Sequence, residues 1–209
     1  MHDFRLSALV LAAALALLFA TAPSAQSQTE WISDLRAGGH VIVFRDGATH
    51  QDQADTDPLN LKNVAQQRQL NEQGRALARA IGDALRKLRI PVAQVHTSMF
   101  NRAVETGLLM NFATLTASVD LTEGGLVVPP IENNRRAQAL RALAATLPPP
   151  GSNAVIVTHK PNIMDAFGRD WFDIREGEAS VFRPQAGGYK LIVRVPAEEW
   201  SKLAQTAAN

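Results

Sequence analysis

Residues 41–49 read VIVFRDGAT, and this stretch sets the architecture expected of the chain. Its four leading apolar residues are typical of a buried strand, and Gly47 permits a sharp turn out of that strand. Arg45 and Asp46 are costly to bury, whereas strand ends in α/β sheets are the usual places for ligands. In isolation, the same two residues could form an ordinary ion pair at a turn, which contributes little to stability.

The composition fits one globular domain. The chain has 209 residues, of which 46% are hydrophobic and 20% are charged, so a sizeable core is expected. The formal net charge of +1 gives no reason to expect a nucleic-acid partner, and any anion site must come from a local cluster of cations. The chain has no cysteine, which excludes disulfides and thiolate chemistry.

The first 27 residues have the layout of a secretory signal peptide. A short segment with a cation, Arg5, precedes an almost unbroken apolar run from Leu6 to Ala20, and small residues follow. The run is shorter than the roughly 20 residues that span a bilayer, which argues against the alternative of a membrane anchor. We therefore predict export to the periplasm or the medium, cleavage between about residues 22 and 27, no stable membrane insertion afterwards, and a single domain over residues 28–209.

Turn residues and hydrophobic periodicity predict strands that alternate with helices. A cap at Asn71 begins the clearest helix, which Pro91 stops, and a polar loop over residues 47–69 is expected to form a flap over a site. Such alternation predicts an α/β fold, here a three-layer sandwich with helices on both faces of a mostly parallel sheet. The strands are expected over residues 40–44, 92–96, 117–121, 154–157, 178–182 and 189–195, and the helices over residues 30–37, 71–88, 101–112, 132–147, 163–167 and 196–208.

Side chains suited to an oxyanion follow several of these strands. In a parallel sheet the carboxyl ends of the strands share one edge, so we expect these side chains to meet. Two arginines, a lysine and a histidine beside helix starts would suit phosphate, which an arginine can grip through two oxygens. The residues are Arg45, Asp46, His96, Thr97, Ser98, Arg102, Glu123, Thr158, His159 and Lys160.

Short motifs from about residue 40 to the end of the chain resemble the histidine phosphatase superfamily, in its phosphoglycerate-mutase-like branch. RDGAT at residues 45–49 stands where the family has Arg-His-Gly, and LNEQG at 70–74 matches its Leu-x-x-x-Gly. TSMFNRAVET at 97–106 matches Ser-Ser-x-x-x-Arg-Ala-x-Glu-Thr, LTE at 121–123 matches Leu-x-Glu, and VTH at 157–159 matches a late strand that ends in histidine. Each motif is weak alone, but the ordered set is a strong signal.

The resemblance implies a phosphoric monoester hydrolase that acts on a small phosphorylated substrate without a cofactor or a metal. It implies that Arg45, Arg102 and His159 hold the phosphoryl oxygens and that Glu123 can protonate the leaving group. Lys160 joins the phosphate ligands in the predicted constellation. In the family, a histidine after the first arginine attacks phosphorus, and Asp46 stands at that catalytic position here.

Asp46 leaves several interpretations open. It could attack phosphorus itself and form an aspartyl-phosphate, or His50 or His96 could serve as the nucleophile instead. The site could also have lost its phosphoenzyme chemistry and act as a non-catalytic pseudo-phosphatase that binds an anion or a partner, or the substitution could be special to this chain. A carboxylate at 4–5 Å from a phosphate costs roughly 3–4 kcal/mol per pair of unit charges at an effective dielectric constant near 20.

Three acids in the polar loop, Asp52, Asp55 and Asp57, have a spacing similar to that of a calcium loop. The stretch lacks the glycine and the distal bidentate acid of that motif. We therefore expect a solvated turn here and no metal site.

Overall fold

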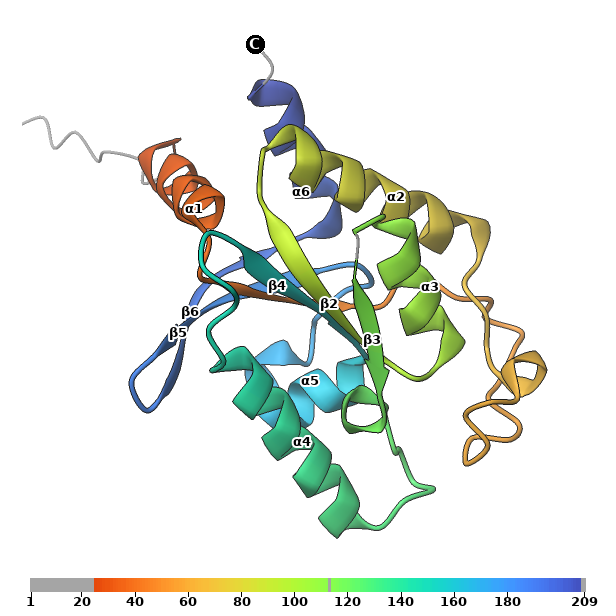
Figure 1. Cartoon of the computed structure of the whole chain (residues 1–209). Helices are drawn as coiled ribbons and strands as arrows, with labels where there is room; N and C mark the ends of the chain where they lie inside the picture. The colour runs from red at the N-terminus through yellow and green to blue at the C-terminus, as the bar shows by residue number, and fades with distance from the viewer. Residues whose placement is uncertain (1–24, 113, 208–209) are drawn as a thin grey trace, which may run out of the picture.

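The computed structural model of the chain describes residues 25–112 and 114–207. The predicted signal segment lies outside these residues up to position 24. The centre of the fold is a six-stranded sheet with the order β3-β2-β4-β1-β5-β6 (Figure 1). The strands are β1 (Val41–Arg45), β2 (Val92–Ser98), β3 (Leu115–Ser118), β4 (Asn153–Thr158), β5 (Ala179–Gln185) and β6 (Gly188–Val195).

The sheet is mixed. Strands β3, β2, β4 and β1 run parallel to one another, while β5 is antiparallel to β1 and β6 is antiparallel to β5. The predicted α/β fold with a mostly parallel sheet is therefore confirmed, and the predicted late hairpin supplies its antiparallel part. Because four strands run parallel, their carboxyl ends lie along one edge of the sheet.

Side chains that alternate along β1 build a hydrophobic layer on each face of the sheet. Ile42 and Phe44 belong to one cluster, which α1, α2, α3 and α6 cover, whereas Val41 and Val43 belong to the other, which α4 and α5 cover (Figure 1). A central strand buried on both faces explains its unbroken apolar run. Within the described part of the chain, no helix is both long and apolar enough to cross a membrane. The helices are α1 (Ala25–Ala37), α2 (Glu72–Lys87), α3 (Asn101–Leu109), α4 (Pro130–Ala144), α5 (Lys160–Phe167) and α6 (Ala197–Thr206), with short 3₁₀ helices η1 (Val64–Gln66), η2 (Val119–Leu121) and η3 (Arg169–Trp171).

Strand β3 is expected over residues 117–121 but lies earlier in the chain, at Leu115–Ser118. The strand ends at Ser118, whose Oγ accepts a hydrogen bond from the backbone N of Asp120 at 3.1 Å. This cap turns the chain into η2 instead of continuing the strand. Helix α4 begins at Pro130, two residues earlier than expected, because proline is favourable in a first helical turn. Helix α1 starts at Ala25 rather than residue 30, and α3 ends at Leu109 rather than residue 112.

Close backbone packing fixes the corner that follows β1. A Cβ atom at Gly74 would lie 2.2 Å from the carbonyl oxygen of Ala48, so only glycine fits at the start of α2. Asn71 caps that helix by accepting from the Gly74 backbone N at 2.8 Å, and its own backbone N donates to the Ala48 oxygen at 3.0 Å. Thr49 and Leu70 pair as an isolated bridge. The loop over residues 47–69 is therefore closed at its base.

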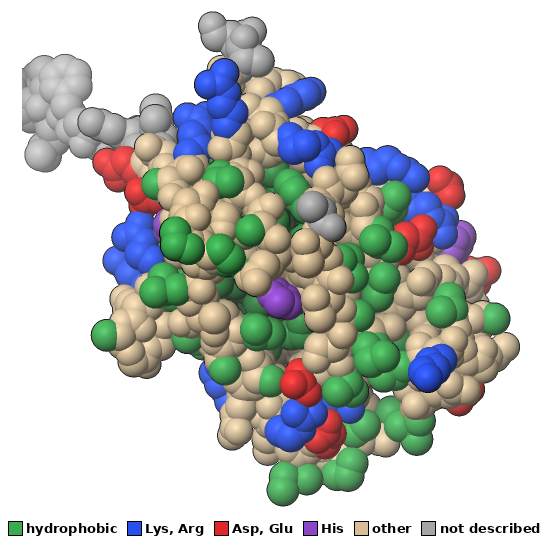
Figure 2. Space-filling model, in the orientation of Figure 1, with side chains coloured by type: hydrophobic (Ala, Val, Ile, Leu, Met, Phe, Trp, Pro, Cys, Tyr) green, Lys and Arg blue, Asp and Glu red, His purple; other side chains and the backbone are tan. Residues whose placement is uncertain are grey.

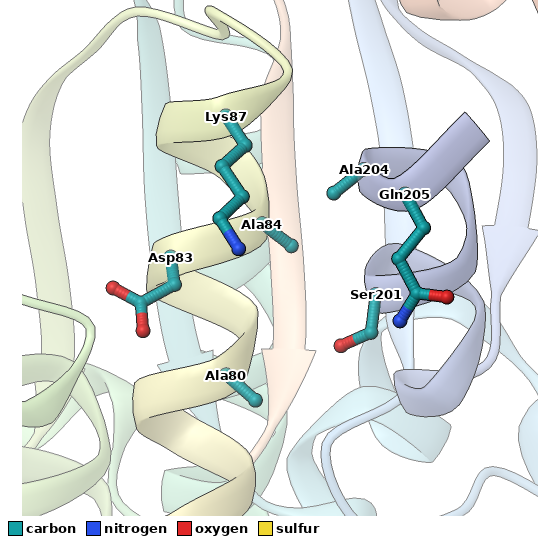
Figure 3. Close-up of a pocket in the computed structure, with 7 residues that line it drawn as sticks. All are labelled: Ala80, Asp83, Ala84, Lys87, Ser201, Ala204 and Gln205. Carbon is teal, nitrogen blue, oxygen red and sulfur yellow. The ribbon is translucent and has the colours of Figure 1, made fainter. Parts of the chain in front are cut away.

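A surface groove of about 470 Å³ lies between α2 and α6 (Figure 3). It flanks the C-terminal half of α2, whereas the corner after β1 meets the N-terminal end of that helix at Gly74. The groove is thus separate from the predicted site. Its lining residues are Ala80, Asp83, Ala84, Lys87, Ser201, Ala204 and Gln205.

Candidate anion-binding site

Four side chains predicted from the strand ends meet at the carboxyl edge of the sheet. We call this group, together with one acid from the loop over residues 47–69, the Arg102 cluster. Strand β1 pairs in register with β4 at Arg45 and Thr158, and the backbone N of Asp46 donates to the Thr158 oxygen at 2.9 Å. This pairing places the residues after both strands side by side. The cluster consists of Asp46, Asp55, Arg102, Glu123 and His159.

Arg102 is the centre of the cluster and is completely buried. Its Nε lies 3.2 Å from Oδ2 of Asp46, its Nη1 lies 3.0 Å from Oδ1 of Asp55, and its Nη2 contacts Oε1 of Glu123. The guanidinium also lies 4.3 Å from the centre of the Phe100 ring, which is a favourable cation–π arrangement. One cation thus fills the space between three carboxylates.

Asp46 is buried between Arg102 and His159. Its Oδ2 lies 3.1 Å from His159 Nδ1 and 3.2 Å from Arg102 Nε. Burial opposes ionisation of this carboxyl, but His159, Arg102 and Arg45 outweigh that effect and lower the pKa of Asp46 below its ordinary value of 3.8. Asp46 is therefore a charged group at neutral pH and repels a second anion.

The imidazole ring of His159 is held from its other side. Its Nε2 lies 2.8 Å from Oγ of Ser98, which also accepts from the backbone N of Phe100 at 3.0 Å. The Phe100 ring meets the imidazole edge-on, with ring centres 5.6 Å apart. These contacts orient the ring so that Nδ1 faces Asp46. Ser98 and Phe100 therefore position a functional side chain, a role that the sequence did not reveal.

Two buried nitrogen atoms in the cluster lack an aligned hydrogen-bond partner among the described residues. They are Arg102 Nε and His159 Nδ1. Both nitrogens lie within ion-pair distance of the same Asp46 oxygen, but the geometry of neither contact is that of a hydrogen bond. Buried donors are nearly always satisfied, so an exception in a native fold calls for an explanation such as a ligand or a water molecule.

Glu123 is held in place by the backbone around it. Arg136 Nη1 donates to the Thr122 oxygen at 2.8 Å, and Thr158 Oγ1 donates to the Leu121 oxygen at 2.7 Å. Glu123 contacts Arg102 and also lines a small cavity at the surface. A proton donor to a leaving group would have to lie in such a place, between the anion-binding groups and solvent.

Arg45 lies next to the cluster and is more exposed. Its Nη1 donates to the Ile174 oxygen at 2.8 Å, and its Nη2 lies 3.4 Å from Oε1 of Glu176. About a quarter of its side chain is exposed, at 24%. It is close enough to lower the pKa of Asp46. Arg45 therefore keeps hydrogen-bonding capacity that a ligand could use.

Three other predicted residues, Lys160, His50 and His96, do not belong to the cluster. Lys160 places its Nζ 4.5 Å from the centre of the Phe172 ring, and its role as a phosphate ligand stays a prediction. Among the described residues, no hydrogen bond or ion pair joins His50 or His96 to Asp46, Arg102 or His159. His96 also lies inside β2 rather than at its end, because the strand continues to Ser98. Burial lowers the pKa of His96.

Asp55 is the member of the cluster that the sequence analysis missed. We expected it in a solvated turn, but its Oδ1 contacts Arg102 and accepts from the backbone N of Arg68 at 2.9 Å. The available signal was the loop itself, which leaves directly from the corner after β1. In the part of the chain that the structure describes, no group of three or more His, Asp or Glu side chains is arranged to hold a metal ion.

No protein-family model matches the sequence, and a search of curated proteins finds no relative. Solved structures do match. The protein histidine phosphatase SixA, complexed with tungstate, matches with a TM-score of 0.52 and 18% identity, over 77% of this chain and 98% of that chain. A mycobacterial glucosyl-3-phosphoglycerate phosphatase complexed with VO3 has a TM-score of 0.51 and 16% identity, over 74% of this chain and 97% of that chain. A candidate alpha-ribazole-5'-P phosphatase from Escherichia coli has a TM-score of 0.53 and 14% identity, over 77% and 97%. At these identities the likeness shows the fold alone, and this chain has the α/β fold of phosphoglycerate-mutase-like histidine phosphatases.

Proposed function

We propose that this protein binds a phosphate-type anion at Arg45, Arg102 and His159, and that Asp46 suppresses the phosphoryl transfer of a phosphomonoesterase. The observation that carries the proposal is the pair of buried nitrogens, Arg102 Nε and His159 Nδ1, that lack aligned partners. With a proton on Nδ1, an oxyanion whose oxygens lie along both N–H directions would satisfy two donors that one carboxylate oxygen leaves unsatisfied.

The cluster has side chains of the types that bind phosphate, but its carboxylates oppose the binding of an anion. Guanidinium groups bind phosphate oxygens through two parallel hydrogen bonds, and Arg45 has capacity for such bonds at the exposed side. Two of the nitrogens of Arg102 already meet Asp55 and Glu123. A phosphate that binds Nε and a second nitrogen of Arg102 must therefore displace one of these carboxylates.

Asp46 stands where the resemblance puts the nucleophilic histidine, and its surroundings oppose nucleophilic attack. A lowered pKa marks a carboxylate that Arg102 and His159 stabilise in the ionised form. An approaching phosphate at 4–5 Å meets a repulsion of roughly 3–4 kcal/mol per pair of unit charges, before relaxation, at an effective dielectric constant near 20. If Asp46 suppresses phosphoryl transfer completely, the protein is a pseudo-phosphatase that binds an anion without turnover.

The test compares the wild-type protein with the Asp46→His and Asp46→Asn variants. Turnover is followed with p-nitrophenyl phosphate and a panel of biological phosphate esters, while binding of inorganic phosphate and vanadate is measured by calorimetry. We expect millimolar or tighter phosphate binding by the wild type, and turnover about 10³-fold or more below that of Asp46→His. Asp46→Asn should bind phosphate at least about 10-fold more tightly, because it removes one negative charge, and should remain inactive.

Two outcomes would contradict the proposal in different ways. Equal turnover by the wild type and Asp46→His would show that Asp46 does not suppress the reaction. Absence of phosphate and vanadate binding by all three folded proteins would remove the anion site. Thermal unfolding curves establish beforehand that both variants fold, so that a null result is informative.

Export is a second part of the proposed function. The sequence of residues 1–27 supports it, because a short cationic start precedes an apolar run and small residues. Expression of the full chain, followed by fractionation and mass spectrometry of the mature N-terminus, should find the protein outside the cytoplasm with a start between about residues 23 and 28. An intact N-terminus on a cytoplasmic protein would contradict the prediction.

A further inference from the structure

A small cavity opens next to the Arg102 cluster. Its volume is about 260 Å³, roughly the share of liquid volume that eight or nine water molecules occupy at about 30 Å³ each. The cavity is thus large enough for one small organic group but not for a polymer. Its lining residues are Asp55, Pro58, Phe100, Glu123, Gly124, Gly125, Leu126 and Val127.

The cavity and the cluster share two side chains, and a third side chain contacts both. Asp55 and Glu123 both line the cavity and contact Arg102. Phe100 lines the cavity and packs against both Arg102 and His159. A phosphoryl group bound to Arg102 and His159 would therefore direct its ester substituent into this cavity.

The walls of the cavity are apolar except for two carboxylates. Pro58, Phe100, Leu126 and Val127 supply hydrophobic surface, and two adjacent glycines add no polar side chain. Leu126 and Val127 are exposed. Hydrophobic side chains gather at the lower edge of the face shown in Figure 2. In Figure 1, the start of α4 and the chain that leads into it lie at the same edge. Such exposed apolar surface beside a polar site is typical of a ligand-binding region.

We propose that this cavity holds the organic group of a phosphate monoester, and that it favours a neutral apolar group over one that carries a carboxylate. The inference rests on the proposed function, because the phosphoryl group must first bind at the cluster. An aryl or alkyl group gains from burial against Phe100 and Val127. A second carboxylate is disfavoured because Asp55 and Glu123 already line the cavity, whereas its lining in the described part of the chain includes no lysine or arginine.

The test measures the affinities of three anions for the wild-type protein by calorimetry. Inorganic phosphate reports on the cluster alone, phenyl phosphate adds an apolar group, and phosphoglycolate adds a carboxylate. We expect phenyl phosphate to bind at least about 10-fold more tightly than inorganic phosphate, and phosphoglycolate to bind no more tightly than inorganic phosphate.

A pair of matched variants locates the effect. Val127→Asp places a charge in the cavity wall, whereas Ile131→Asp makes a similar change at an exposed position of α4 that does not line the cavity. We expect Val127→Asp to remove most of the preference for phenyl phosphate over inorganic phosphate, and Ile131→Asp to retain it. The ratio of the two affinities cancels any general effect of the added charge on anion binding.

The outcomes separate this inference from the proposed function. If inorganic phosphate binds but phenyl phosphate binds no more tightly, the cavity proposal is wrong and the anion site stands. If both variants keep the preference equally, the apolar group binds elsewhere and the proposal is also wrong. If none of the three anions binds, the proposed function and the inference fail together.

Discussion

Arg45 and Arg102 differ sharply in their surroundings, although the sequence predicts the same role for both. Arg45 ends β1, is partly exposed, and donates to one backbone oxygen with a longer contact to Glu176. Arg102 lies in the first turn of α3, is fully buried, and contacts three carboxylates and an aromatic ring. The first arginine is available to a ligand, and the second is already neutralised.

The difference shows that the position of a cation does not by itself measure its capacity to bind an anion. A buried guanidinium without partners would be prohibitively costly, so the fold supplies acids around Arg102. These acids compete with any phosphate. Affinity at this site therefore depends on how readily the competing carboxylates can be displaced, and substitutions at the two arginines should have different effects.

The largest expected effect is on stability, from the Arg102→Ala variant. Removal of the cation leaves Asp46, Asp55 and Glu123 close together without the charge that lies between them, and breaking a buried ion pair typically costs 3–5 kcal/mol. We expect a loss of about that size in the free energy of unfolding, measured by urea denaturation. Phosphate binding should also be lost.

Arg135→Ala is the matched control for Arg102→Ala. Arg135 also pairs with two acids, Asp120 and Glu132, but its side chain is half exposed. Solvent screening should make its loss much less destabilising than that of Arg102. Equal losses in the two variants would show that burial of Arg102 does not increase its contribution to the free energy of unfolding.

The next effect is on affinity, from Arg45→Ala. A hydrogen bond to a charged group contributes about 1.5–3 kcal/mol, so phosphate affinity should fall at least about 10-fold in calorimetric titrations. Stability should change little, because the side chain is partly exposed and has one short hydrogen bond. Arg45→Lys retains the charge but cannot form the bidentate hydrogen bonds of a guanidinium, so it should recover only part of the affinity. Unchanged affinity in Arg45→Ala would place the anion away from β1.

The sequence predicted most of this arrangement because it rests on local patterns. The apolar run that ends at Arg45, and the equally buried β4 that ends before His159, identify two neighbouring parallel strands. The carboxyl ends of neighbouring parallel strands lie at the same edge of the sheet, whatever the conformation of the loops that connect them. The convergence of Asp46, Arg102, Glu123 and His159 follows from that topology.

The ion-pair partners were harder to predict, because they depend on loop conformation. Asp55 reaches Arg102 through a loop that carries three closely spaced acids, and nothing in that pattern distinguishes Asp55 from Asp52 or Asp57. The contact of Lys160 with Phe172 depends in the same way on η3 and the residues after it. Single side-chain partners of this kind are set by three-dimensional packing and not by periodicity.

A smaller effect is expected in the pH dependence of stability. The pKa of Asp46 is lower in the folded protein than its ordinary value of 3.8, so the unfolded chain binds more protons in that range. Ionised Asp46 therefore stabilises the fold fully above about pH 4, and this contribution is lost as the pH falls from there through the lowered pKa. The stability advantage of the wild type over Asp46→Asn should shrink over the same interval. A difference that stays constant from pH 6 to pH 2 would contradict this assignment.

The smallest effect tests the competition at Arg102 directly, through Asp55→Asn. The substitution keeps the shape of the side chain but removes one carboxylate that lies 3.0 Å from Nη1 of Arg102. Since Asp55 is partly exposed, the contact contributes about 1 kcal/mol, and we expect phosphate to bind about five times more tightly. Asp52→Asn removes the same charge from an exposed position in the same loop and should change the affinity less. If Asp55→Asn weakens phosphate binding instead, Asp55 holds Arg102 in the position that binds phosphate. The two arginines would then differ in the side chains that hold them in place, and not in how free they are to bind an anion.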